Sequence, residues 1–182
     1  MLRKKKWLWL FLLVGLVFLP SCNGGGILTF WIDFEALIPL TQYHVGDAIV
    51  EDGVDMKFEI FYWFPGGSTT NGYAEVQTLN KAGHIGNDLF LNNINMAFDF
   101  HTMVVKITFY AGYYGGNVNM RVNGFLGNHP DLITFNGLVL GGVNVQVVLT
   151  APNLYQVTLT GNINAFSVGG QEFFIDHLFA TE

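Results

Sequence analysis

Basic residues are scarce in this 182-residue chain, which has eight lysines and arginines against fourteen aspartates and glutamates. Four of the eight occupy residues 3–6, so the chain after residue 21 keeps four basic residues and a formal charge of −10. A nucleic-acid-binding surface needs clustered Lys and Arg to pair with phosphates. The charge balance therefore argues against a nucleic-acid partner, and it provides no electrostatic attraction to anionic lipid.

Cysteine and serine are also rare. With Cys22 as the only cysteine, the chain can form neither an internal disulfide nor a zinc site built on cysteine pairs. The two serines that follow, Ser68 and Ser167, lie outside any Gly-x-Ser-x-Gly motif. Five scattered histidines lack His-x-His or His-Glu-x-x-His spacing. The sequence thus carries no signal for nucleophilic catalysis or for a transition-metal site.

The N-terminus combines a charged segment with an apolar run. Residues 3–6 are Arg-Lys-Lys-Lys, and residues 7–19 are almost wholly apolar. A membrane-spanning helix needs ~20 such residues, so this shorter run fits the apolar region of a signal peptide. The run ends in Leu19-Pro20-Ser21-Cys22, which resembles the lipobox of bacterial lipoproteins. Pro20 departs from the usual Ala or Ser of that motif.

The resemblance implies removal of residues 1–21 as a signal peptide and lipidation of Cys22. Residues 22–26 would then be the lipidated cysteine and a short Gly-rich tether, and residues 27–182 a single domain. The expected location is the cell envelope, with the lipid anchor in the outer membrane or on the outer face of the plasma membrane. An ordinary secretory signal cleaved elsewhere and an N-terminal membrane anchor are the alternatives.

From residue 27 onward, apolar residues recur with a period of two. Phe30 and Ile32 alternate with Trp31, and Met120 alternates with Asn119 and Arg121. About ten such short segments separated by turn signals predict an all-β fold, a two-sheet β-sandwich of jelly-roll type. The alternation predicts that the following residues point into the core: Phe30, Ile32, Phe58, Ile60, Phe98, Ile107, Val118, Met120, Val122 and Val145.

The C-terminal segment Gly-Gly-Gln-Glu-Phe-Phe-Ile-Asp-His-Leu, residues 169–178, is similar to the closing strand of galactose-binding-like jelly rolls. The resemblance implies a last strand beside the first one, and several carbohydrate-binding modules of that type hold a structural calcium ion nearby. Glu172 and Asp176 share one strand face and are the candidate metal ligands. Calcium requires 6–8 oxygen ligands, and ordinary surface carboxylates are the alternative interpretation.

Several aromatic residues occupy positions that the alternation assigns to solvent. Sugars present C–H faces that pack on aromatic rings, and hydroxyls that pair with amides and guanidinium groups. Arg121, the only arginine after residue 21, is the strongest single candidate. A salt bridge to a neighbouring strand, for instance to Asp99, is the alternative for this side chain. The full set of candidate ligand-binding residues is Trp31, Tyr113, Tyr114, Asn119 and Arg121.

Three functions fit these observations. The first is a non-catalytic, membrane-tethered module that binds a carbohydrate. The second is a structural or assembly lipoprotein that packs against another envelope protein. The third and weakest is a glycan-active enzyme, because paired carboxylates can assemble from distant strands. The candidate carboxylates for such a pair are Asp33, Glu35, Glu59, Glu75 and Asp99.

The lipobox interpretation predicts that Cys22→Ala prevents processing by the lipoprotein signal peptidase. The variant should keep the signal peptide and lack lipid, which mass spectrometry of the purified protein measures directly. If the variant has the processed mass and partitions into membranes like the wild type, Cys22 is not the lipidation site.

Overall fold

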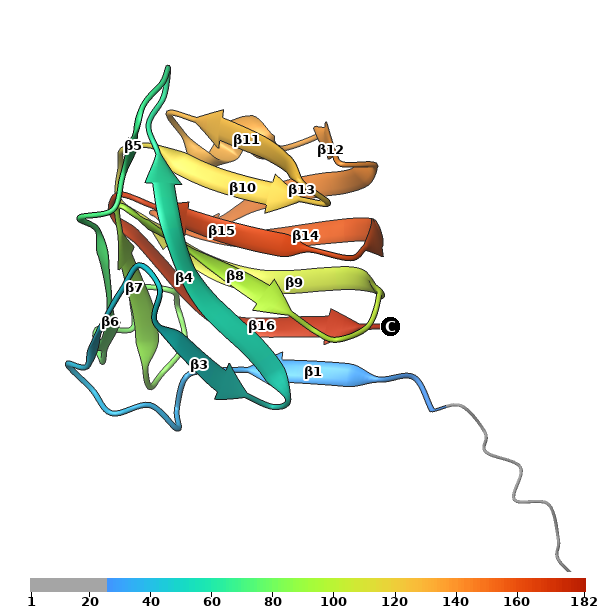
Figure 1. Ribbon diagram of the computed structural model, residues 1–182, viewed down its shortest axis with the longest axis horizontal. Coiled ribbons are helices and arrows are strands. Elements are labelled where there is room, and N and C mark those ends of the chain that lie inside the picture. The colour runs from blue at the N-terminus through green and yellow to red at the C-terminus, as the bar shows by residue number, and fades with distance from the viewer. Residues whose placement is uncertain (1–25) are drawn as a thin grey trace, which may run out of the picture.

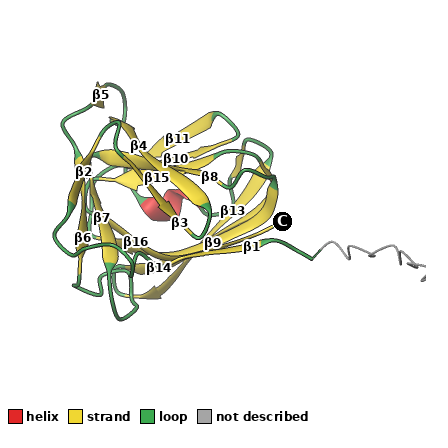
Figure 2. Ribbon diagram, turned by 60° about the horizontal axis from the view of Figure 1, so that its bottom comes forward, coloured by secondary structure: helices red, strands yellow, loops and turns green. Residues whose placement is uncertain are grey.

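The computed structural model describes residues 26–182, so the predicted signal peptide and Cys22 lie outside the described residues. The predicted two-sheet β-sandwich is confirmed, with sixteen strands where the sequence indicated about ten (Figures 1 and 2). The described residues contain one helix, the short 3-10 helix η1 (Leu132–Phe135). None of their helices is long and apolar enough to cross a membrane.

The larger sheet has nine strands, all paired in antiparallel fashion. Their order is β12 (Val139–Leu140), β13 (Val143–Ala151), β14 (Leu154–Ile163), β9 (Val104–Tyr113), β16 (Phe173–Thr181), β7 (Asp88–Asn92), β6 (Tyr73–Gln77) and β2 (Gln42–His44), and β1 (Thr29–Ile32) also pairs with β16. The closing strand β16 therefore has β9 on one edge, and β7 and then β1 along the other.

The smaller sheet has seven strands, again all antiparallel. Their order is β11 (Phe125–His129), β10 (Val118–Val122), β15 (Phe166–Gly170), β8 (Ile94–Asp99), β4 (Val54–Tyr62) and β3 (Ala48–Glu51), with β5 (Ser68–Thr69) paired to β4. The chain passes from one sheet to the other eight times, between β2 and β3, β5 and β6, β7 and β8, β8 and β9, β9 and β10, β11 and β12, β14 and β15, and β15 and β16. This interleaving is the connectivity of a jelly roll.

Local turn chemistry accounts for the tightest hairpins. Asn123-Gly124 joins β10 to β11, and Asp52-Gly53 joins β3 to β4, with positive φ at all four residues. Positive φ at both central residues is the geometry of a type I′ turn, which matches the twist of the paired strands and favours Asn-Gly and Asp-Gly. Asn123-Gly124 thus forms the hairpin turn that this dipeptide favours.

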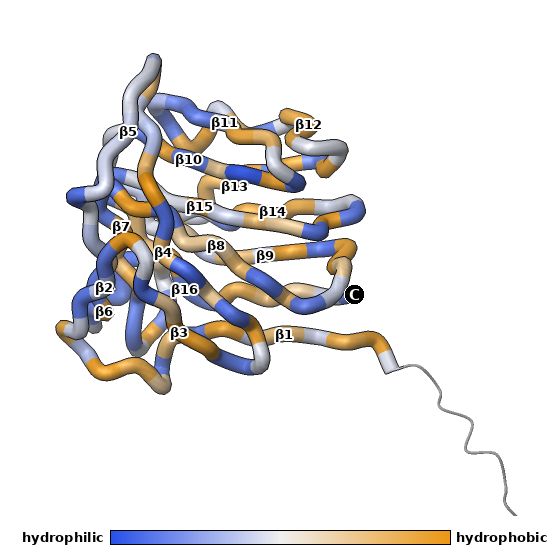
Figure 3. The backbone as a smooth tube through the Cα atoms, in the orientation of Figure 1, coloured by the Kyte–Doolittle hydropathy of each residue, from blue (hydrophilic) through white to orange (hydrophobic). Residues whose placement is uncertain are grey.

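The core lies between the sheets and follows the predicted alternation closely (Figure 3). Of the ten predicted core residues, all but Phe30 and Ile60 are buried, and Phe30 packs against the core while partly exposed. Ile60 is a wrong prediction, because it is half-buried while the next residue, Phe61, is fully buried outside the main cluster. The alternation changes phase there because Ile60 is the last β4 residue paired with β8, after which the strand leaves the sheet.

Phe58 is fully buried and stacks on Tyr43 at a ring-centroid distance of 5.0 Å. Phe58→Ala should lower the free energy of unfolding by ~3–5 kcal/mol, through lost burial and the cavity left behind. Phe125, which is 65% exposed, provides the matched control. Phe125→Ala should change the free energy of unfolding by no more than ~0.5 kcal/mol. Urea denaturation measures both. Equal effects of the two substitutions would contradict the assigned core.

Candidate functional site

A row of asparagines on the outer face of the seven-stranded sheet holds the end of β4. Beyond Ile60 this strand crosses in front of its own sheet (Figure 1). The Asn119 side chain accepts a hydrogen bond from the Tyr62 N–H and donates one to the Tyr62 carbonyl, both at 2.8 Å. Asn95 donates to the Ile60 carbonyl and Asn128 to that of Trp63. Three amide side chains thus replace the backbone ladder that β4 loses.

Gly169 makes this row continuous. It pairs with Asn95 on one side and with Asn119 on the other. A Cβ at Gly169 would lie 2.1 Å from the Ile94 carbonyl oxygen and 2.4 Å from the Asn95 amide oxygen. Only glycine fits at this position. Because Gly169 has no side chain, the Asn95 amide can donate a hydrogen bond to the Asn119 amide oxygen across β15, at 3.2 Å.

Beside the asparagine row lies a groove with a floor of small residues. Lys57, Ala97, Ser167 and Arg121 occupy adjacent positions on β4, β8, β15 and β10. Three adjoining pockets of about 170, 290 and 470 Å³ run along this face and share Glu59 as a common lining residue. The small side chains of Ala97 and Ser167 leave this space open between the longer flanking residues. We call it the Arg121 groove.

Arg121 and Glu59 form an ion pair that spans the groove. The Arg121 Nη1 and Glu59 Oε2 atoms lie 3.5 Å apart, and each side chain is about one-third exposed. The guanidinium also lies over the Tyr62 ring, 5.4 Å from its centroid. The salt bridge to a neighbouring strand, named above as the alternative for Arg121, is thus present, but its partner is Glu59, and Asp99 faces His101. Such half-exposed pairs contribute at most ~1 kcal/mol, so Arg121 is available to a ligand.

Two of the predicted ligand-binding residues are not exposed, contrary to the prediction. Asn119 is 1% exposed because the crossing β4 covers it. Tyr113 is 9% exposed, and its hydroxyl lies 2.7 Å from the Gly116 carbonyl oxygen and 3.0 Å from that of Pro130. Burial, together with the nearby Asp131 and Tyr155, raises the pKa of Tyr113 to about 12. Both side chains hold chain segments in place in this structure.

Tyr114 and Glu172 meet on the outer face of the nine-stranded sheet. The Tyr114 N–H donates to the Glu172 carbonyl at 3.0 Å, and both side chains line a pocket of about 350 Å³. The other residues that line it are Lys81, Phe90, Asn92 and Phe174. The ring of Phe174 contacts those of Phe90 and Tyr114, at centroid distances of 4.7 and 5.6 Å. We call this the Tyr114 pocket.

Trp31 is 46% exposed on the same sheet but far from the Tyr114 pocket. It pairs with Phe179 on β16, seven residues beyond Glu172, which corresponds to roughly 20 Å. Its ring contacts the His177 ring edge-on, and its Nε1 donates to Asp33 at 3.1 Å. Of the five predicted ligand-binding residues, Tyr113 and Asn119 are therefore buried. The other three lie at separate places: Trp31 on β1, Tyr114 at its pocket and Arg121 in its groove.

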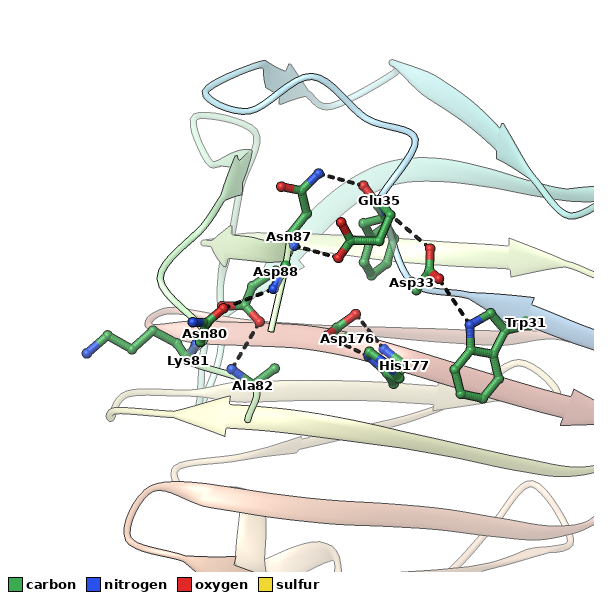
Figure 4. A network of polar contacts seen from close by, with 12 residues as sticks. Trp31, Asp33, Glu35, Asn80, Lys81, Ala82, Asn87, Asp88, Asp176 and His177 are labelled. Atoms are coloured by element: carbon green, nitrogen blue, oxygen red, sulfur yellow. Dashed lines mark hydrogen bonds and ion pairs between the residues drawn. The ribbon is translucent and has the colours of Figure 1, made fainter. Parts of the chain in front are cut away.

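Between Trp31 and the Tyr114 pocket lies a network around two buried carboxylates (Figure 4). Asp88 and Asp176 occupy adjacent positions on β7 and β16, next to the pair Leu89 and Ile175, and neither is exposed. Asp88 accepts hydrogen bonds from the backbone N–H groups of Lys81 and Ala82, at 2.5 and 3.2 Å. These bonds fix the loop between β6 and β7 over the sheet.

The second buried carboxylate, Asp176, has its contacts with the neighbouring residue His177. Asp176 accepts from the His177 N–H and lies 2.7 Å from its Nδ1. The backbone at His177 has φ of 48°, and the pairing of β16 with β9 shifts at this point. Burial raises the pKa of Asp176 to about 6 and the charge of Asp88 adds to this, while contacts with His177 oppose it. Burial likewise raises the pKa of Asp88.

Of the two predicted metal ligands, Glu172 directly precedes β16 and Asp176 lies within it, and Phe174 stands between them along the chain. Glu172 faces the Tyr114 pocket and Asp176 contacts His177. Within residues 26–182, no group of three or more His, Cys, Asp or Glu side chains is arranged to hold a metal ion. The calcium site therefore stays a prediction from sequence.

Two of the five carboxylates considered for catalysis, Asp33 and Glu35, accept hydrogen bonds from backbone groups in or near the loop after β1. Asp33 accepts from the Glu35 N–H, and Glu35 accepts from the Asn87 N–H at 2.8 Å. Burial opposes ionisation of Asp33, but hydrogen bonds from Glu35 and Trp31 outweigh it and lower the pKa of Asp33. Glu51, which accepts from the Asp33 and Phe34 N–H groups, has its pKa raised by burial. These contacts make the acids part of the scaffold.

No family model and no curated protein matches this chain. The functional argument therefore rests on the geometry of the two surface sites. Sequence reasoning missed Lys81, Phe90 and Phe174, and the groove residues Lys57 and Tyr62. Alternation places Phe90 outward between Leu89 and Leu91, but only the strand order brings it next to Phe174 and Tyr114.

The Asp176 carboxyl predicts a specific pH dependence of stability. Its pKa is higher in the folded chain than the ordinary value of 3.8, so the folded state binds the proton more tightly. Its stabilising contribution is present below pH 3.8 and is lost as the pH rises through about 6. Relative to the wild type, Asp176→Asn should gain up to roughly 3 kcal/mol in free energy of unfolding between acid and neutral pH.

Urea denaturation at pH 3.5 and pH 7.5, on the wild type and the variant, measures this difference. Glu172→Gln, which changes an exposed carboxyl directly before the same strand, provides the control and should show no such gain. A wild-type-to-variant difference that is the same at both pH values would contradict the raised pKa of Asp176.

Proposed function

We propose that this protein is a non-catalytic, lipid-anchored binding module of the cell envelope whose ligand is a carbohydrate. The single observation that carries the proposal is the Arg121 groove. It crosses an open sheet face, has a floor of small residues and presents a half-exposed Arg121–Glu59 pair beside the Tyr62 ring.

The chemistry of the groove suits a polyhydroxylated ligand. Each sugar hydroxyl both donates and accepts hydrogen bonds, so a sugar site needs donors and acceptors close together. Arg121 and Lys57 supply donors, and Glu59 supplies acceptor oxygens. The Tyr62 ring adds an apolar surface against which the C–H face of a sugar can pack.

The shape of the groove favours an extended ligand over a compact one. The three pockets adjoin along one face and extend from β3 across β4, β8 and β15 to β10. Adjacent strands lie ~4.8 Å apart, so four strand spacings correspond to roughly 19 Å. That length suits several linked sugar units.

A second function, docking to another envelope protein, is favoured by one apolar patch. Phe125 and Val139 are 65% and 66% exposed, and their strands β11 and β12 contact each other at the edges of the two sheets. Loss of a co-purifying envelope protein in a Phe125→Asp, Val139→Asp variant that still binds glycans would support this function.

The groove predicts that Arg121→Ala abolishes binding of the glycans recognised there. Arg121→Lys should bind more weakly than the wild type, because an ammonium cannot form the paired hydrogen bonds of a guanidinium. Mature protein in detergent can be tested on an array that includes cellohexaose, xylohexaose, maltohexaose and oligogalacturonate. Isothermal titration calorimetry then gives affinities for each positive probe.

The same variants separate binding from stability. Loss of the Arg121–Glu59 pair should lower the free energy of unfolding by at most ~1 kcal/mol. Strong destabilisation of Arg121→Ala with glycan binding intact would make Arg121 a structural residue and refute the groove as the ligand site.

A further inference from the structure

The Tyr114 pocket lies on the sheet opposite the Arg121 groove and shares no residue with it. Its base is aromatic, since Phe174 packs against Phe90 at 4.7 Å and lies outside the main core. Tyr114, which is 39% exposed, forms one wall and packs edge-on against Phe174. An exposed ring beside two further rings on a sheet face is a surface that packing of the core does not require.

Polar groups surround these rings on several sides. The Glu172 carboxylate, the Asn92 amide and the Lys81 side chain all line the pocket. Glu172 and Asn92 supply hydrogen-bond acceptors, and Asn92 and the Lys81 cation supply donors, around a volume of about 350 Å³. Aromatic walls with a few convergent polar groups are typical of small-ligand sites.

The wall that carries Lys81 is held rigidly by its backbone. Its N–H donates to Asp88, as does that of Ala82. Gly112 allows this loop to lie directly on the sheet, since a Cβ at Gly112 would be 2.1 Å from the Lys81 carbonyl oxygen. The pocket is thus pre-formed, which lowers the entropy cost of binding.

The Lys81 ammonium is held much less firmly than its backbone. It lies over the Tyr114 ring, 4.9 Å from the centroid. A contact of this kind at an exposed site is weak, because water competes for the ammonium. A ligand can therefore displace it from the ring and gain a hydrogen-bond donor at the same time.

We propose that the Tyr114 pocket is a second carbohydrate site, which binds one pyranose unit with its C–H face on the Tyr114 ring. The Glu172 carboxylate and Asn92 amide bind its hydroxyls, and Lys81 moves from the ring to donate to another hydroxyl. This proposal deepens the proposed function and rests on a different set of residues, so each site can fail independently. With two sites on opposite sheets, one molecule can engage two glycan chains.

The test compares four forms of the full mature protein on the oligosaccharide array and by calorimetry: wild type, Tyr114→Ala, Arg121→Ala and the double variant. Arg121→Ala should still bind some of the probes, or still show one of two binding steps in calorimetry. Tyr114→Ala should bind those same probes, or show that same step, with at least tenfold lower affinity. The double variant should bind none of the probes. Tyr114→Phe keeps the ring and should retain binding.

The possible results distinguish the two sites. Binding by Tyr114→Ala that equals the wild type on every probe overturns the pocket proposal and leaves the groove standing. Loss of all binding in Arg121→Ala alone also overturns the pocket. Loss in Tyr114→Ala with Arg121→Ala unaffected supports the pocket and refutes the groove. A wild type that binds none of the probes overturns both.

Discussion

Burial of the Asp88 and Asp176 carboxylates is the constraint on which the outer face of the nine-stranded sheet depends. A buried charge is costly unless hydrogen bonds surround it. Backbone N–H groups supply those bonds, from Lys81 and Ala82 to Asp88 and from His177 to Asp176. The shift in β16 pairing at His177 and the close approach of the loop to Gly112 both follow from this requirement. The same loop forms one wall of the Tyr114 pocket.

The seven-stranded sheet meets a similar requirement with uncharged groups. When β4 leaves the sheet, its carbonyl and N–H groups lose their strand partners, and the row of Asn95, Asn119 and Asn128 replaces them. Amides carry both donors and acceptors, so they can match a backbone without introducing charge. Because the row binds β4 on one side only, the small residues beside it remain uncovered and form the groove floor.

Sequence patterns predicted what depends on local geometry. Alternation identified the core along most of the length over which strands stay paired in their sheet, as in β10, and Asn123-Gly124 forms the turn that its composition favours. Alternation failed at Ile60, because the point where a strand leaves its sheet is set by contacts with asparagines up to 65 residues away along the chain. Alternation correctly placed Asn119 on the outer face of its sheet. The exposure expected there was wrong because the end of β4, a segment distant in sequence, covers Asn119. The pairing of Tyr114 with Glu172 required the strand order and register.

The position of the chain ends bears on how accessible the Tyr114 pocket would be in a membrane-anchored molecule. Thr29 pairs with Thr181, so an anchor that precedes β1 joins the sandwich at the C-terminal end of β16 (Figure 1). Glu172 lies at the other end of that strand, nine residues away, which corresponds to roughly 30 Å. The seven residue steps from Cys22 to Thr29 can span only ~25 Å, so a lipid on Cys22 would keep the Thr29 end as the end nearer to the bilayer. Lipidation at Cys22 would therefore leave the Tyr114 pocket at the end of β16 that is farthest from the anchor, where a glycan chain can reach it.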